Sequence, residues 1–172
     1  MEIKIYKATA APSAWTFTIP PIRDFVKKYA GDGKGWVDPY AGDNSPAEIT
    51  NDINPDRKAI YHVDALDFCN EISMPAFYNG VIFDPPYSYR QVGEHYKAVG
   101  KKATSMDTSA NFYNRVMNAI CDSIKPGGYA LSFGWNTNAF GKNRGFEPVE
   151  ILIVSHGGHH NDTLCTAEWK VT

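Results

Sequence analysis

The segment Gly80-Val81-Ile82-Phe83-Asp84-Pro85-Pro86-Tyr87 decides the fold, and predicted strands and helices alternate on both sides of it. Its β-branched and aromatic residues follow an Asn-Gly pair and precede two prolines, which predicts a buried strand. The two prolines fix φ and remove two backbone N–H donors, so the chain leaves the strand in a rigid frame of carbonyl acceptors. Asp84 therefore stands at the carboxyl end of a buried strand, where we expect a crevice around its side chain.

The alternation of elements predicts an α/β fold with a mainly parallel sheet covered on both faces. Apolar spacing and turn residues predict helices over 20–30, 65–72 and from 107–109 to Ile124, strands over 36–38, 48–52, 59–64, 80–84 and 129–135, and a C-terminal antiparallel hairpin formed by 150–156 and 163–171. About nine residues, 39–47, separate the first two of these strands. Because a crossover with its helix needs at least ~10–12 residues, we expect the first crossover helix to be shortened or absent.

Length and composition predict one domain, residues 1–172. The chain has 172 residues, of which 43% are hydrophobic and 21% charged, which excludes collagen-like, disordered and disulfide-scaffold classes. No apolar run approaches the ~18 residues of a membrane span, and the N-terminus lacks a signal-peptide layout. The three cysteines are widely spaced, with no CxxC pair, which favours a reduced, cytoplasmic setting.

Charge is balanced over the whole chain but unevenly distributed along it. The 17 Lys and Arg against 19 Asp and Glu argue against a protein that binds mainly through phosphate contacts. Residues 38–67 carry seven acids against two basic residues, whereas residues 88–106 carry four basic residues against one acid. This pattern predicts two neighbouring sites with different ligands. Two solvated faces of opposite sign explain the charges equally well.

The residues after the central strand suit a planar base that bears an amino group. The Asp84 carboxylate and the Pro85 carbonyl each accept one proton of an exocyclic –NH2, while the Tyr87 ring stacks on the base. An amino nitrogen held between two acceptors has a more available lone pair for attack. The alternative is that these residues form a rigid turn after a core strand and bind no base.

Asp84-Pro85-Pro86-Tyr87 resembles the D/N/S-P-P-Y/F/W motif of the DNA adenine-N6 methyltransferases, which use S-adenosylmethionine. The stretch Asp38-Pro39-Tyr40-Ala41-Gly42 matches the first five positions of their cofactor motif, D-P-F-A/C-G-S-G, whose second glycine is Asn44 here. The overall pattern is similar to that of small phage-borne adenine methylases. The resemblance implies a Rossmann-like methyltransferase fold and direct in-line methyl transfer to the N6 amine of a flipped-out adenine in DNA.

The resemblance also implies roles for individual positions. The acid after the second strand, Asp52, would bond the cofactor ribose, and the acid after the third, Asp64, the adenine amino group of the cofactor. The implied cofactor-binding residues are Thr16, Phe17, Thr18, Asp38, Tyr40, Gly42, Asp52, Asp64 and Ala65. The implied catalytic residues are Asp84, Pro85, Pro86 and Tyr87, and the candidate substrate-binding residues are Tyr89, Arg90, Lys101, Lys102 and Asn136. Packing in the core explains Phe17 at least as well as a cofactor contact does. For Tyr89 and Arg90, the alternative is that they are solvated loop residues.

The expected partner is DNA, and no membrane and no metal are expected. His156, His159 and His160 share one turn without a cysteine at ligand spacing, which disfavours a zinc site. Many members of the family that the chain resembles carry a separate target-recognition domain, and none is expected here. Sequence specificity would therefore come from the loop 88–107, from the N-terminus, or from a second copy or another partner. Two other functions stay open: an RNA amino-methyltransferase, for example on guanine N2, and a catalytically inactive cofactor-binding subunit of a larger methyltransferase.

Overall fold

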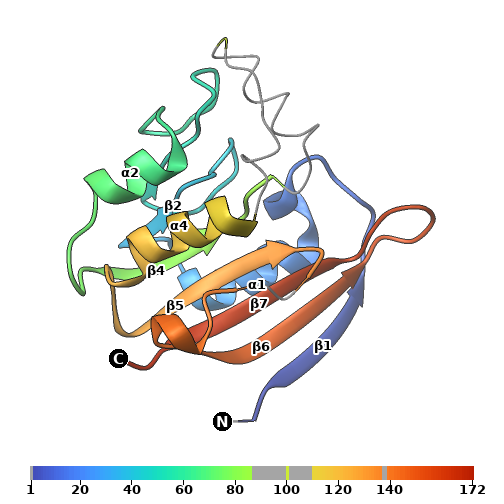
Figure 1. Cartoon of the computed structure of the whole chain (residues 1–172). Helices are drawn as coiled ribbons and strands as arrows, with labels where there is room; N and C mark the ends of the chain where they lie inside the picture. Colours follow the sequence, from blue (N-terminus) through green and yellow to red (C-terminus); the bar gives the residue numbers. More distant parts are fainter. Residues whose placement is uncertain (1, 87–99, 101–109, 137–138) are drawn as a thin grey trace.

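The computed structural model describes residues 2–86, 100, 110–136 and 139–172 (Figure 1). Its elements in chain order are β1 (Lys4–Thr9), the short 3-10 helix η1 (Thr16–Thr18), α1 (Pro20–Ala30), β2 (Trp36–Asp38), β3 (Ile49–Thr50), α2 (Ala65–Glu71), β4 (Tyr78–Phe83), α4 (Ala110–Cys121), β5 (Ile124–Gly134), η3 (Lys142–Arg144), β6 (Phe146–Ser155) and β7 (Thr163–Lys170). Among the helices of these described ranges, none is long and apolar enough to cross a bilayer.

The strands form one seven-stranded sheet in the order β1-β6-β7-β5-β4-β2-β3. Strand β7 is antiparallel to both of its neighbours, and the other pairs are parallel. The mainly parallel sheet with a C-terminal antiparallel hairpin is therefore confirmed. The chain leaves β2 toward β3 on one side and returns as β4 on the other, so the strand order reverses between β2 and β4. A ligand crevice is expected at the carboxyl ends of these two strands.

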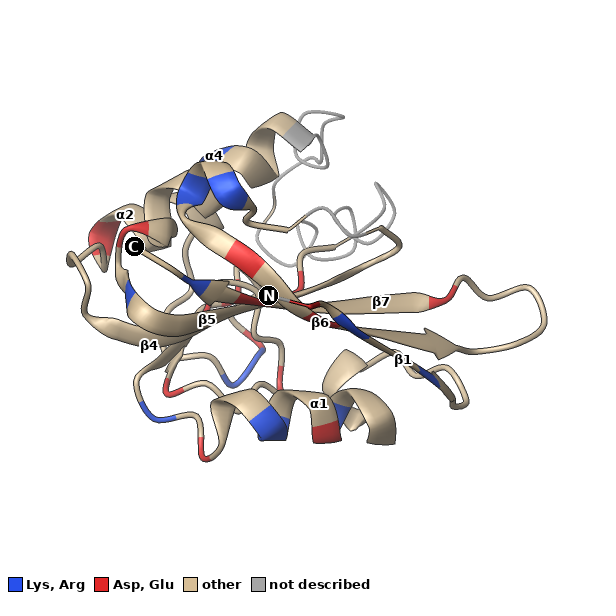
Figure 2. Cartoon of the chain, turned by 90° about the horizontal axis from the view of Figure 1, so that it is seen from below, with Lys and Arg blue, Asp and Glu red and all other residues tan. Residues whose placement is uncertain are grey.

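Helices cover both faces of the sheet. Figure 2 shows α1 on one face and α2 with α4 on the other. Ile22, Phe25 and Val26 of α1 pack against apolar residues of β4, β5 and β7. The helix begins with two prolines in its first turn, where their missing N–H groups cost nothing, and ends at Gly31, whose φ is 60°. Both features confirm the helix predicted over 20–30.

No helix lies between β2 and β3, where residues 39–48 form turns and irregular structure. The expected loss of the first crossover helix is thus confirmed. Two other predicted elements differ. The predicted strand 48–52 shortens to Ile49–Thr50, and the predicted strand 59–64 is wrong, since only one isolated bridge joins Asn51 to Tyr61. The Asn51 side chain bonds the backbone of Val63 there, in place of a strand ladder.

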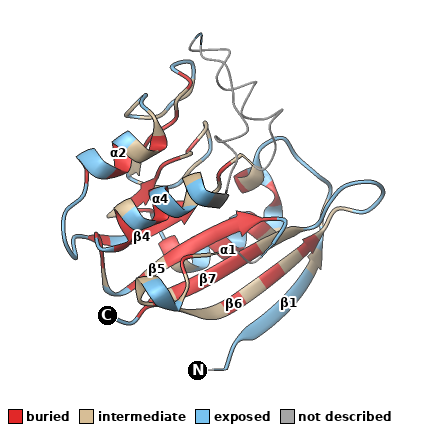
Figure 3. Cartoon of the chain, viewed as in Figure 1, coloured by how far each residue is buried: buried red, intermediate tan, exposed pale blue. Residues whose placement is uncertain are grey.

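Two further differences concern the start of β5 and the strand β1. Residue Ile124, predicted on a helix, begins β5, because α4 ends at Cys121. The Lys-Pro-Gly-Gly sequence that follows lies inside β5 at an irregularity in its pairing with β4, the kind of position where a strand tolerates proline. Strand β1 has no counterpart in the prediction. Its side chains are mostly exposed on both faces (Figure 3), so its sequence carries only a weak apolar alternation.

Candidate active site

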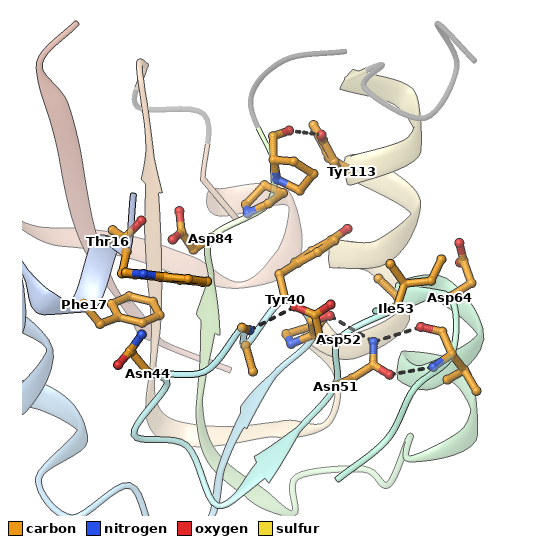
Figure 4. A pocket seen from close by; sticks show the side chains of 18 of the residues that line it. Thr16, Phe17, Tyr40, Asn44, Asn51, Asp52, Ile53, Asp64, Asp84 and Tyr113 are labelled. Carbon is orange, nitrogen blue, oxygen red and sulfur yellow. Dashed lines mark hydrogen bonds between the residues drawn. The ribbon is translucent and has the colours of Figure 1, made fainter. Parts of the chain in front are cut away.

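A cavity opens at the carboxyl edge of β2, β3 and β4, where the strand order reverses (Figure 4). Its empty space, open mouth included, is about 1050 Å³. Six segments of the chain contribute to the walls. The lining residues are 14–17, 39–42, 44, 51–53, 63–65, 84–86, 112 and 113.

The cavity brings together most of the residues predicted for the site. Those that line it are Thr16, Phe17, Tyr40, Gly42, Asp52, Asp64, Ala65, Asp84, Pro85 and Pro86. Thr18, Asp38 and Asn136 are not among the lining residues; Thr18 is exposed and bonds Ser13 and the Trp15 carbonyl. The candidate residues Tyr87, Tyr89, Arg90, Lys101 and Lys102 lie outside the described part of the chain.

Backbone N–H groups hold the two predicted cofactor acids in place. The carboxylate of Asp52 accepts hydrogen bonds from the N–H of Gly42 at 3.1 Å and of Asn54 at 2.8 Å. Asp64 is the N-cap of α2 and accepts from the Leu66 N–H at 2.9 Å. Both side chains thus have fixed directions before any ligand enters.

The charge of the lining is negative. Three carboxyl groups, of Asp52, Asp64 and Asp84, face the cavity, and no Lys or Arg is among its described lining residues. In Figure 4, Asp84 lies beside Thr16 on one side and Asp64 lies on the other, with Tyr40 and Asp52 between them. Such a lining favours a cationic ligand and disfavours one that carries phosphates.

Asp84 lies half-buried at the end of β4 and faces the cavity. Burial raises the pKa of Asp84 to about 7, and a hydrogen bond with the Thr16 hydroxyl acts in the opposite direction. Thr16, predicted as a cofactor residue, therefore also contacts the predicted catalytic acid. Near neutral pH, a positively charged or hydrogen-bond-donating ligand would favour the carboxylate form.

Helix α4 fixes the double proline from the other side. The Tyr113 hydroxyl donates a hydrogen bond to the Pro86 carbonyl, and its ring packs edge-on against Tyr40 and Phe83. The Pro86 carbonyl is thus already engaged. The acceptor role predicted for a ligand amine accordingly rests on the Pro85 carbonyl together with Asp84.

Replacing Tyr113 by phenylalanine removes the bond to Pro86 and keeps the ring. We expect kcat of the reaction at this cavity to fall about tenfold, because the double proline loses its support, while cofactor affinity stays within about twofold. Steady-state kinetics and calorimetry measure the two effects. Tyr29→Phe is the matched control, since its hydroxyl bonds Glu150 away from the cavity. An unchanged kcat for Tyr113→Phe would contradict the role of this bond.

Asn51 connects the loops beneath the cavity and was missed in the sequence. Its side chain is 1% exposed and lies just before Asp52. The amide Nδ2 donates to the carbonyls of Pro39, at 3.0 Å, and Val63, at 3.1 Å, and Oδ1 accepts from the Val63 N–H at 3.1 Å. One side chain therefore joins the segments that follow β2, follow β3 and precede α2. Only its position at a strand end signals this in the sequence.

Asp38 lies below the cavity floor and is fully buried. It accepts a hydrogen bond from the Tyr40 N–H at 2.9 Å. Burial raises the pKa of Asp38 to about 7, although hydrogen bonds with Ser45 and Tyr40 act the other way. Asp38 therefore shapes the loop after β2 from beneath, and its carboxyl group is held in an environment that disfavours its charged form.

The raised pKa of Asp38 makes stability depend on pH. Between about pH 4 and 7 the native protein keeps a proton that the unfolded chain has released, so the free energy of unfolding falls as pH rises. One such group gives a slope of at most ~1.4 kcal/mol per pH unit. We expect Asp38→Asn to flatten this decline in urea unfolding measured across that range. An equal slope in both proteins would contradict the prediction; Asp24→Asn, at an exposed site, is the control.

The described histidines form no metal centre. Both ring nitrogens of His156 already have partners, the Ala10 carbonyl at 3.0 Å and the Thr163 hydroxyl at 2.8 Å. Within the ranges that the structure describes, no group of three or more His, Cys, Asp and Glu side chains is arranged to hold a metal ion. The three cysteines are buried and unpaired.

No protein-family model and no curated protein matches this sequence. Solved structures do match its fold. TrmN from Thermus thermophilus aligns with a TM-score of 0.59 at 13% identity, over 89% of this chain and 49% of its own, so the chain spans about half the length of that protein. A 1,6-didemethyltoxoflavin-N1-methyltransferase from Burkholderia thailandensis was solved with bound 1,6-didemethyltoxoflavin and S-adenosylhomocysteine. It aligns with a TM-score of 0.53 at 11% identity, over 94% of this chain and 93% of its own. The chain thus has the Rossmann-like methyltransferase fold.

Proposed function

We propose that this protein transfers a methyl group from S-adenosylmethionine to the N6 amine of adenine in DNA. One observation carries the proposal: Asp84 and the double proline line the same cavity as Asp52 and Asp64. The residues expected to orient a target amine and those expected to hold the cofactor therefore meet in one site, although 19 residues lie between Asp64 and Asp84 in the sequence.

The cavity suits S-adenosylmethionine in charge and in donor groups. This cofactor is a net cation at neutral pH, and the described lining carries three carboxyl groups without a basic residue. Asp52 would accept from the ribose hydroxyls and Asp64 from the adenine amino group, with the loop around Gly42 beside them. The shared fold supports the same cofactor, since the Burkholderia enzyme was solved with S-adenosylhomocysteine.

The residues of this chain would act by orienting the amine. When bound, the cofactor supplies an electrophilic methyl group on a sulfonium. The Asp84 carboxylate and the Pro85 carbonyl accept the two amine protons and direct the nitrogen lone pair toward that methyl. The methyl would leave with the sulfonium's C–S electron pair remaining on sulfur, and Asp84 and solvent would accept the proton that the methylated nitrogen releases. Most of the acceleration comes from positioning.

A nucleobase has to leave the base stack to reach this site, so a duplex substrate would be bound with the target adenine flipped out. The described lining adds aromatic surface for such a base from Tyr40, Phe112 and Tyr113. Stacking of Tyr87 and phosphate contacts of Arg90, Lys101 and Lys102 remain predictions, as do the substrate role of Asn136 and a second copy or partner that supplies target recognition.

Labelled cofactor tests the proposal directly. The protein is incubated with S-adenosylmethionine that carries a labelled methyl and, in parallel, with single-stranded DNA, duplex DNA and RNA, and the digested nucleosides are identified by mass spectrometry. We expect label on N6 of deoxyadenosine. Label on RNA alone would replace the proposal by an RNA amino-methyltransferase. Cofactor binding without transfer to any substrate would replace it by the inactive subunit, and no cofactor binding would overturn it.

A further inference from the structure

Trp15 closes the cavity on the side where the first crossover helix is missing. Residues 39–48 contain no helix, so the glycine loop after β2 has no helical support behind it. The Trp15 ring lies over this loop: a Cβ atom placed on Gly42 would be 3.7 Å from Cζ3 of Trp15. Both residues line the cavity. A side chain from the N-terminal segment therefore supports the loop.

Trp15 is in turn held from outside the cavity by an arginine. The Arg57 guanidinium carbon lies 4.8 Å from the centre of the Trp15 ring, a cation–π arrangement. Its Nη1 atom pairs with Asp43 Oδ2 at 3.1 Å, and the other oxygen of Asp43 accepts from the Lys58 N–H at 2.9 Å. Trp15, Arg57 and Asp43 form one continuous set of contacts, named here the Trp15 clamp.

The Trp15 clamp joins segments that are distant in sequence. Trp15 precedes η1, Asp43 belongs to the loop after β2, and Arg57 belongs to the loop after β3. The Gly42 N–H also bonds Asp52, so the clamp and the predicted ribose acid hold the same loop from two sides. Arg57 itself does not line the cavity. Its side-chain contacts lead toward the cavity through Trp15 and Asp43.

We infer that Arg57 and Asp43 are positioning residues for the cofactor, which act by holding Trp15 against the Gly42 loop in the place of a crossover helix. The inference rests on the proposed use of S-adenosylmethionine. In the usual arrangement of such sheets, the helix after the first strand supports the glycine loop and presents its N-terminus to the ligand. Here an aromatic ring and a paired cation supply that support.

Cofactor binding by matched variants tests the inference. Arg57→Met keeps a long apolar side chain and removes the cation; we expect the Kd for S-adenosylmethionine and its KM to rise about fivefold, with kcat unchanged. Arg57→Lys restores a cation and should stay within about twofold of the wild type. Asp43→Asn should weaken binding less than Arg57→Met does. Arg23→Met is the control, because Arg23 is exposed and pairs with the exposed Asp24.

A double variant separates positioning from general stability. If Arg57 acts through the ring, Arg57→Met adds no further loss of affinity in a Trp15→Ala background, whereas additive effects would overturn the inference. An unchanged Kd for Arg57→Met would overturn it as well. Tryptophan fluorescence adds a direct readout, because the emission change on titration with S-adenosylhomocysteine should shrink in Trp15→Phe. Failure of the wild type to bind the cofactor would instead overturn the proposed function.

Discussion

Asp84→Ala is expected to abolish methyl transfer, with a loss of at least 10²- to 10³-fold in kcat, while leaving cofactor binding within about threefold. The carboxylate is one of two acceptors that orient the target amine, and its contribution is largest while positive charge develops on the nitrogen and is lost from the sulfur. The cofactor acids Asp52 and Asp64 lie elsewhere on the cavity wall and are held by their own backbone contacts. Single-turnover kinetics and calorimetry measure the two quantities on the same preparation.

Two variants sharpen this experiment. Asp84→Asn keeps the shape and one acceptor oxygen but loses the charge, so its activity should fall between that of the wild type and Asp84→Ala. Asp24→Ala, which removes an exposed acid of α1, should change neither quantity. Loss of cofactor binding by Asp84→Ala, with thermal unfolding unchanged, would contradict the assignment of this residue to the amine.

Asn51→Ala is expected to cost about 3 kcal/mol or more of stability. Its removal leaves the buried Pro39 carbonyl without a partner, at a cost of about 1–3 kcal/mol, and also the carbonyl and N–H group of Val63, which lie in a partly buried position and cost less. For a chain of this size the midpoint of thermal unfolding should fall by roughly 6–12 °C. Because Asn51 also joins the loops under the cavity, the surviving native protein should bind the cofactor more weakly.

Asn79→Ala is the matched control for this prediction. The Asn79 amide donates a single hydrogen bond to the Lys34 carbonyl at 2.8 Å, from an exposed position. Water can replace that bond, so the expected loss is below about 1 kcal/mol. Equal losses for the two asparagines in urea unfolding would show that Asn51 is an ordinary loop residue.

The parts of the site that are local in sequence were predictable. The strand before Asp84 is a short apolar run with clear limits, and the double proline defines the turn after it without any tertiary contact. Asp64 was predicted at the end of a strand over 59–64, which is absent; the structure instead makes Asp64 the N-cap of α2, and it still lines the cavity. The short spacing between β2 and β3 likewise left no room for a helix.

Contacts between distant segments were not predictable from one sequence. The predicted strand 59–64 failed because a buried amide, Asn51, takes the backbone bonds that a neighbouring strand would have made. The bond from Tyr113 to Pro86 joins a helix face to a loop, and in the sequence Tyr113 shows only apolar periodicity. Asp38 has the residue type expected at the cavity, yet the turn after β2 directs its side chain beneath the floor.

The N-terminal segment connects the outer edge of the sheet to the cavity. Strand β1 pairs with β6 along six residue pairs at the outer edge of the sheet, and Ala10 forms hydrogen bonds with Ser155 and His156. A few residues later, Trp15 of the same segment lines the cavity. Because β1 anchors this segment at the outer edge of the sheet, we expect that deleting β1 would loosen the cavity wall at Trp15 without removing any residue that lines the cavity.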